Sequence, residues 1–217
     1  MWSTAADAWA SLSEAWQIAF GLAWEGLQAG SPPVGAVIVD SAARVVASGR
    51  SRRFEVAAPA GQLAGTNLAH AEINAMAQLP PGDYFDHVLH TTLEPCLLCT
   101  AAATHAHVGT VIYYTSDPIW VGIRRLPELN DHVAGRWPAW EGPIGGPLAL
   151  WSEVLMAIWQ LREKHDGVFV RLARDSASPA LPIAARFAAD REFEAFKRQP
   201  FDQALASVWD QLCPPSS

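Results

Sequence analysis

Four side chains in two short segments carry the chemistry of this sequence. His70 and Glu72 stand two positions apart, and Cys96 and Cys99 stand three apart, directly after Pro95. One nitrogen and two sulfurs can bind zinc and leave a fourth position open, as catalytic zinc sites do. Zinc lowers the pKa of a bound water molecule to near neutrality. The sequence therefore predicts one catalytic zinc ion per chain, with His70, Cys96 and Cys99 as its ligands.

Glu72 has a different predicted role. Hydrolysis of an amidine-like C–NH2 bond needs a proton taken from water, placed on a ring nitrogen and later given to the leaving amine. One carboxylate beside the activated water can make all three transfers. We expect Glu72 to be this catalytic proton shuttle.

A C-x-x-C pair also occurs in structural zinc sites and in redox pairs. A structural site would need a fourth ligand, and the sequence has no second C-x-x-C, while Cys213 is remote. Four histidines could in principle complete such a site: His87, His90, His105 and His107. The segment 92–95 before the cysteines has no thioredoxin-like pattern. The combination of His70, Glu72 and the cysteine pair favours the catalytic interpretation.

Both ligand pairs are expected where helices begin, over residues 68–79 and 96–105. Proline suits a first helical turn, and the positive end of the helix dipole favours thiolates there. The spacing of apolar residues predicts an earlier helix from Trp9 to Leu27. Strands are expected over 33–40, 44–48, 87–93 and 111–115, with a last one over 167–172. Their alternation with helices predicts parallel pairing.

The segment 118–147 differs from the rest, because it is rich in glycine and proline and contains Trp120, Trp137 and Trp140. A loop of this length in a compact domain is typical of a functional lid, and core tryptophans under a long loop are an equal alternative. We predict a zinc-dependent domain over 1–173, with 118–147 as an insert. A helical extension over 174–217 would pack on the same domain.

Composition limits the class of protein. The chain has 217 residues, of which 50% are hydrophobic and 17% charged, with a net charge of -7. This balance is globular and argues against a broad basic surface for nucleic acid. Three cysteines do not make a disulfide framework. No apolar run is long enough for a membrane helix, and the first residues carry no positive charge. A soluble, cytoplasmic protein without membrane contact is expected.

With His70, Glu72 and the P-C-x-x-C segment, the chain resembles the cytidine and deoxycytidylate deaminase superfamily, in which H-x-E is followed by P-C-x-x-C. Similar stretches are 33–39, 69–76 and 92–99, within about residues 10–115. The branch it resembles most holds guanine deaminases, yeast-type cytosine deaminases and tRNA adenosine deaminases.

The resemblance implies an α/β fold: a three-layer α/β/α arrangement with a mixed five-stranded sheet, here with an extended helical C-terminal part. It implies the same zinc ligands and the same role for Glu72. By the same likeness, the backbone at Ala71 and around Glu94 contacts the substrate. Many members are dimers, so we expect a homodimer with the neighbouring subunit helping to close the pocket.

One departure from the family pattern concerns base recognition. Many relatives carry an asparagine after the glycine that ends the second strand, and it hydrogen-bonds the base. Here the segment is Gly49-Arg50-Ser51-Arg52-Arg53. Ser51 or Arg50 would stand in its place, and we predict Ser51 as a substrate-binding residue.

The leading hypothesis is hydrolytic deamination of a nucleobase, nucleoside or related small heterocycle. A tRNA or other nucleic-acid deaminase is the alternative, in which Arg50, Arg52 and Arg53, with Arg44 nearby, contact phosphate. A solvated turn is the favoured explanation of these arginines. A third hypothesis, a non-catalytic zinc-stabilised partner subunit, is less favoured because Glu72 is present.

Overall fold

The computed structural model describes residues 2–163, 167–187 and 189–213. The strands are β1 (Gly35–Val39), β2 (Val45–Arg50), β3 (Val88–Leu93), β4 (Thr110–Thr115) and β5 (Ala139–Glu141). The helices are α1 (Ala5–Ala10), α2 (Glu14–Gln28), α3 (Ala71–Met76), α4 (Leu97–His105), α5 (Asp131–Ala134), α6 (Pro147–Glu163), α7 (Val168–Asp175), α8 (Ala180–Ala185), α9 (Asp190–Lys197), α10 (Phe201–Ala206) and α11 (Trp209–Leu212), with 3-10 helices η1 (Pro118–Trp120) and η2 (Ile123–Leu129).

The five strands form one mixed sheet in the order β2-β1-β3-β4-β5. β1 is antiparallel to both β2 and β3, whereas β3, β4 and β5 are parallel. The mixed sheet that the family resemblance implied is confirmed. The parallel pairing predicted from alternation is wrong only between β1 and β3, because the tight turn after β1 reverses the chain before the first crossover helix.

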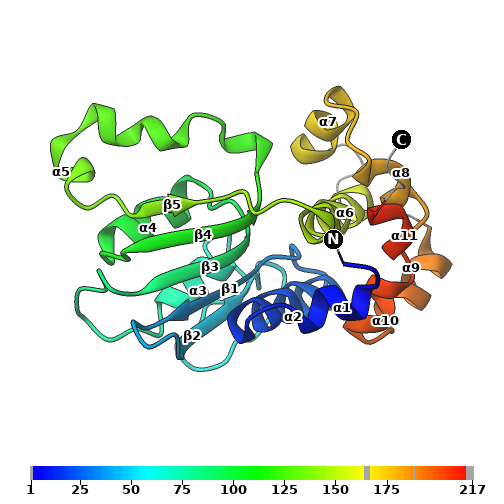
Figure 1. Cartoon of the computed structure of the whole chain (residues 1–217), viewed down its shortest axis with the longest axis horizontal. Helices are drawn as coiled ribbons and strands as arrows, with labels where there is room; N and C mark the ends of the chain where they lie inside the picture. The colour runs from blue at the N-terminus through cyan, green and yellow to red at the C-terminus, as the bar shows by residue number, and fades with distance from the viewer. Residues whose placement is uncertain (1, 164–166, 188, 214–217) are drawn as a thin grey trace.

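Helices cover both faces of the sheet (Figure 1). Gly35 in β1 lies so close to α2 that a Cβ atom there would come within 2.0 Å of the Ala19 carbonyl oxygen. Gly49 in β2 pairs with Ala36, and a Cβ there would come within 2.6 Å of the Ala71 oxygen of α3. Because neighbouring residues of a strand point to opposite faces, α2 and α3 lie on opposite sides. The predicted three-layer α/β/α fold is confirmed.

The helices from α6 onward gather at one end of the sheet beside α1 and α2, at the right of Figure 1. The indole Nε1 of Trp24 in α2 donates to the carbonyl of Gln199 at 3.2 Å. The ring of Trp151 in α6 lies 6.0 Å from that of Trp24 and is fully buried. Through these contacts, the C-terminal helices share one hydrophobic core with α2 and the sheet. The extended helical C-terminal part that the sequence predicted is therefore present.

Three expectations about the elements are wrong. Residues 167–172 do not form a strand, because α7 (Val168–Asp175) occupies them. The fifth strand is instead β5, which lies inside the segment 118–147 and pairs with β4. The helix expected from Trp9 to Leu27 is two helices, α1 and α2. The last four residues of the predicted extension 174–217 lie outside the described part of the chain.

Among the described helices, none combines the length and the apolar character needed to cross a membrane.

Candidate functional site

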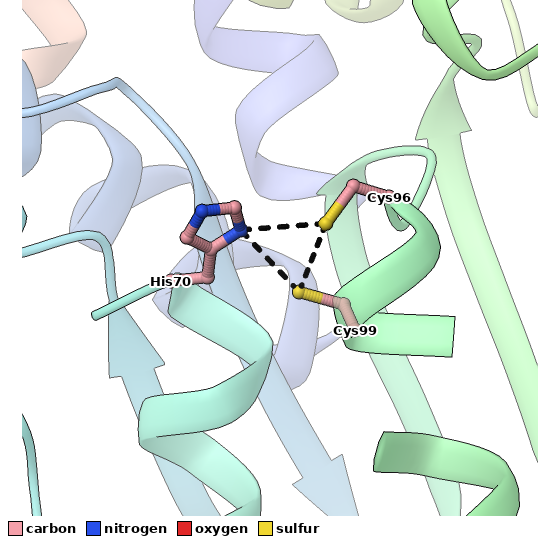
Figure 2. Close-up of side chains that lie close together, drawn as sticks. All are labelled: His70, Cys96 and Cys99. Carbon is pink, nitrogen blue, oxygen red and sulfur yellow. Dashed lines mark hydrogen bonds between the residues drawn. The ribbon is translucent and has the colours of Figure 1, made fainter. Parts of the chain in front are cut away.

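Two helix starts meet at one point in front of the sheet. His70 is the N-cap of α3 and Cys96 is the N-cap of α4, each with extended backbone angles, and Cys99 lies in the first turn of α4. An N-cap side chain stands outside the helix, so it can project into the space before the first turn. Figure 2 shows the His70 ring and the two thiols pointing toward one another from these two helices.

The donor atoms of this triad are spaced as a tetrahedral zinc site requires. His70 Nδ1 lies 3.5 Å from Cys96 Sγ and 3.5 Å from Cys99 Sγ, and the two sulfurs are 3.6 Å apart. Bonds of about 2.3 Å to sulfur and about 2.0 Å to nitrogen at tetrahedral angles imply donor separations of about 3.5–3.8 Å. The three side chains therefore fit zinc, both in donor type and in spacing.

The three side chains of the triad have their pKa values shifted in different directions. The hydrogen bond with Cys99 lowers the pKa of Cys96 to about 4, against the effect of burial, and His70 adds to this lowering. The same hydrogen bond with Cys96, together with burial, raises the pKa of Cys99 well above its usual value. The hydrogen bond with Cys96 also raises the pKa of His70. One thiolate is thus present near neutral pH, and metal binding would release the remaining proton.

Glu72, the second residue of α3, lies beside the triad. Its side chain is 4% exposed. One carboxylate oxygen accepts a hydrogen bond from the Thr91 hydroxyl at 3.3 Å, and the other accepts from the Cys99 thiol at 3.2 Å. Burial raises the pKa of Glu72, and the neighbouring charge of Cys96 adds to this. A carboxyl group in this position can take up and return a proton at the edge of the metal site.

In the described part of the chain, no fourth protein ligand closes the triad. One cluster within the described ranges has three potential ligand residues whose donor atoms are close enough to share an ion. It consists of His70, Cys96 and Cys99. His90 packs against Trp16, and His107 pairs with Asp83.

A cavity of about 220 Å³ opens beside the triad. The three residues predicted to bind substrate, Ser51, Ala71 and Glu94, all line it. The Ser51 hydroxyl is nearly fully buried and has no hydrogen-bond partner. Ala71 is the first residue of α3, so its N–H has no partner within the helix. These groups are free to meet a ligand.

Glu94 uses its side chain for a different purpose. Its carboxylate accepts a hydrogen bond from the backbone N–H of Asp117 at 3.2 Å and one from Arg124 at 3.3 Å. Its own N–H donates to the Thr115 carbonyl. The Glu94 carboxylate thus holds the start of the segment 118–147 against the end of β3, and only its carbonyl remains available to the cavity.

Sequence reasoning missed part of the cavity lining. The missed residues come from the segment after β4 and from α6 and α7: Asp117, Ile119, Met156, Trp159, Gln160 and Phe169. Trp120 had drawn notice only as part of a possible lid. The cavity-lining residues of α6 and α7 cannot be identified from the local sequence, because their pattern is that of residues in the core of any packed helix.

Asp117 is a third carboxylate of the cavity, after Glu72 and Glu94, and is 7% exposed. One of its oxygens accepts a hydrogen bond from the N–H of Ile119 at 2.9 Å. Burial raises the pKa of Asp117 to about 6. The group is therefore poised to gain or lose a proton just below neutral pH.

The arginines near the second strand do not form a free phosphate-binding patch. Arg50 pairs with Glu55 and Arg52 pairs with the same carboxylate, while Arg44 pairs with Asp40. Arg53 lines the cavity and donates to Asn67 at 2.8 Å. Neither a solvated turn nor a phosphate cluster describes this segment, because Arg50 is buried and ion-paired.

Residues 10–115 match the family model described as the cytidine and deoxycytidylate deaminase zinc-binding region. This region includes the triad, Glu72 and the sheet through β4. This part of the chain belongs to the cytidine and deoxycytidylate deaminase superfamily, and zinc is the cofactor of that region.

Two curated relatives show how far sequence similarity extends. A tRNA(Ile)-lysidine synthase of Deinococcus radiodurans is 30% identical over 132 residues, which cover 59% of this chain and 21% of the relative. A tRNA-specific adenosine deaminase of Haemophilus influenzae is 30% identical over 92 residues, which cover 41% of this chain and 49% of the relative. The chain thus spans half or less of the length of these relatives.

The fold is shared with solved structures. One structure, solved in complex with 2,6-diaminopurine, superposes with a TM-score of 0.50 at 18% sequence identity and covers 69% of this chain and 80% of that one. At this identity the likeness concerns the fold.

Proposed function

We propose that this protein is a zinc-dependent hydrolytic deaminase of a small amino-substituted heterocycle, a nucleobase or nucleoside. His70, Cys96 and Cys99 would hold one zinc ion, which when bound supplies an acidified water molecule as the nucleophile. The product would be the corresponding oxo compound and ammonia.

Glu72 performs the proton transfers in this proposal. Its carboxylate takes a proton from water, delivers it to the ring nitrogen beside the reacting carbon, and later protonates the leaving amine. The hydrogen bond from Thr91 orients the carboxylate. Ser51, Ala71 and Glu94 offer a hydroxyl, an N–H and a carbonyl along the cavity, and these would fix the ring in place.

One observation carries the proposal: a carboxylate that is 4% exposed lies beside a three-donor cluster with no fourth protein ligand, and both border one cavity. A structural zinc site has no use for a buried carboxylate next to an open position. A non-catalytic partner subunit would not retain this arrangement.

The test is ammonia release by zinc-loaded protein from a panel of bases, nucleosides and pterins. We expect turnover on at least one of them, and Glu72→Gln should lower it by about 10²–10⁴-fold while zinc content, measured by elemental analysis, stays at one per chain. Release of no ammonia by the wild-type protein would end the proposal. Full turnover by Glu72→Gln would remove Glu72 from the shuttle role.

Likeness to tRNA-specific adenosine deaminases supports the alternative of a nucleic-acid substrate. The ion pairing of Arg44, Arg50 and Arg52 and the net charge of -7 favour the small molecule. Tight RNA binding whose affinity falls steeply as the salt concentration rises would favour the alternative. If the protein binds no RNA at low or at high salt, the small heterocycle is favoured.

We further propose a cytoplasmic homodimer. All three cysteines are free thiols, which suits a reducing compartment. Light scattering that gives the mass of one chain would contradict the dimer.

A further inference from the structure

The cavity has a wall that comes from outside the family region. Met156, Trp159 and Gln160 of α6 and Phe169 of α7 line it, and each is at most 9% exposed. The indole of Trp159 is fixed by a hydrogen bond from its Nε1 to the carbonyl of Gly30 at 3.0 Å. The C-terminal helices of the same chain therefore form a rigid and largely apolar side of the cavity.

Gln160 is the polar member of this wall, and its orientation is defined. Its Oε1 accepts a hydrogen bond from the N–H of Val170 at 3.3 Å. Val170 is the third residue of α7, so its N–H has no partner within the helix. A backbone N–H can be accepted by the amide oxygen and not by the NH2 group, so the oxygen must face α7.

The close packing of Gly167 supports the same orientation. A Cβ atom at Gly167 would lie 2.2 Å from Gln160 Oε1 and 3.4 Å from Nε2. The oxygen is therefore the end nearer to the start of α7, and the NH2 group is turned away from it. Among the described residues, Nε2 has no hydrogen-bond partner.

Nε2 is not among the fully buried side-chain atoms that lack a partner, so water reaches it, and a ligand acceptor in the cavity would replace that water. The Ser51 hydroxyl, 2% exposed, is a second unpartnered polar group on the same cavity. The cavity of about 220 Å³ is smaller than the ~300–1,000 Å³ typical of pockets for drug-sized ligands. Its size suits one heterocyclic ring system without an attached sugar.

We propose that Gln160 determines substrate specificity: its NH2 group donates to an oxo group of a free base, which lies against Trp159 and Phe169. This inference rests on the proposed function. The C-terminal half of the chain would then add a recognition group to those that the family region offers, whereas the reacting groups all come from the family region. The substrate class is a free amino-oxo heterocycle.

The experiment measures binding without turnover. Zinc-loaded Glu72→Gln protein is titrated calorimetrically with guanine and with cytosine, and with the analogues that lack the oxo group, 2-aminopurine and 4-aminopyrimidine. We expect at least one oxo base to bind about tenfold more tightly than its analogue, the effect of one hydrogen bond of about 1.4 kcal/mol. Adding Gln160→Leu should abolish this preference.

Two further variants separate recognition from structure. Gln160→Glu keeps an acceptor for the Val170 N–H and removes the NH2 donor, so it too should lose the preference for the oxo base. Gln203→Leu, an exposed position on α10, should keep it. Unchanged preference in Gln160→Leu, or binding of neither oxo base, overturns the inference.

The outcome is distinguishable from failure of the proposed function. If the wild-type protein releases ammonia from some compound while Gln160→Leu changes neither KM nor oxo preference, the function stands and the role of Gln160 fails. If no compound is deaminated while the oxo preference is measured and depends on Gln160, the recognition role stands and the deaminase proposal fails.

Discussion

The two halves of this chain contribute to one cavity in different ways. The half that contains the family region supplies a metal triad and a buried carboxylate, His70, Cys96, Cys99 and Glu72, all at the starts of two helices. The C-terminal half supplies an aromatic wall and one amide. The candidate reacting groups therefore come from the family region alone, whereas the cavity lining comes from both halves.

The halves also differ in what holds their residues in place. The triad depends on local geometry, because an N-cap and a first turn determine where its side chains project. The C-terminal wall depends on contacts between distant segments, such as those of Trp159 with Gly30 and of Trp24 with Gln199. Four changes test this contrast.

The largest effect should follow removal of a metal ligand. Cys96→Ala should lower zinc affinity by more than about 100-fold and leave no measurable ammonia release, since two remaining donors hold the ion poorly. Zinc per chain, measured after dialysis, checks this. Cys213→Ala is the matched control, because Cys213 lies outside the cavity, and it should retain one zinc. Full zinc content in Cys96→Ala would contradict the assignment.

Trp151→Ala should show whether the halves fold as one unit. Trp151 is fully buried between α2 and the C-terminal helices, so the change should lower the free energy of unfolding by about 3–5 kcal/mol. Urea unfolding followed by tryptophan fluorescence and by zinc release should show both midpoints falling together. A zinc-release midpoint that stays at the wild-type value would mean that the halves unfold separately. Leu129→Ala, at a side chain that is 78% exposed, is the control.

Asp117 lies at the junction of the halves and should make stability depend on pH. Its pKa rises from 3.8 to about 6 through burial, so the folded state favours the protonated form. The wild-type protein should lose stability as pH rises from about 4 to about 6. Asp117→Asn should be more stable than wild type at pH 7, by at most about 3 kcal/mol.

This difference should vanish below pH 4, where Asp117 is protonated in both the folded and unfolded states. Urea unfolding of both proteins at pH 4 and pH 7 measures it. Equal free energies of unfolding of the wild-type protein and Asp117→Asn at pH 7 would show that burial of the Asp117 carboxylate does not reduce stability.

Gly167→Ala should have the smallest effect and should act only on recognition. The added Cβ would lie 2.2 Å from Gln160 Oε1 and would displace the amide, so we expect KM to rise severalfold with kcat and zinc content unchanged. Gly21→Ala in α2 is the control, since nothing lies within 4 Å of its Cβ position. A fall in kcat at constant KM would place Gly167 in another role.

Local patterns predicted most of the sheet and the helix starts, but two assignments failed for physical reasons. The run Val168-Phe169-Val170 is rich in β-formers, and the sequence therefore predicted a strand. It forms the first turn of α7, where Gln160 accepts a hydrogen bond from the Val170 N–H. β5 has only three residues, and none of them is fully buried, so the sequence carries no strand signal there and only the pairing with β4 defines it.

The sequence by itself identified the residues of the candidate metal site. The spacing of His70, Glu72, Cys96 and Cys99 is short, so local helix geometry suffices to bring each pair into one place. Only the tertiary structure decided what surrounds the site: α6 and α7 return from the far end of the chain and place Gln160 on the cavity. Such contacts depend on packing across the core, which no periodicity in the sequence records.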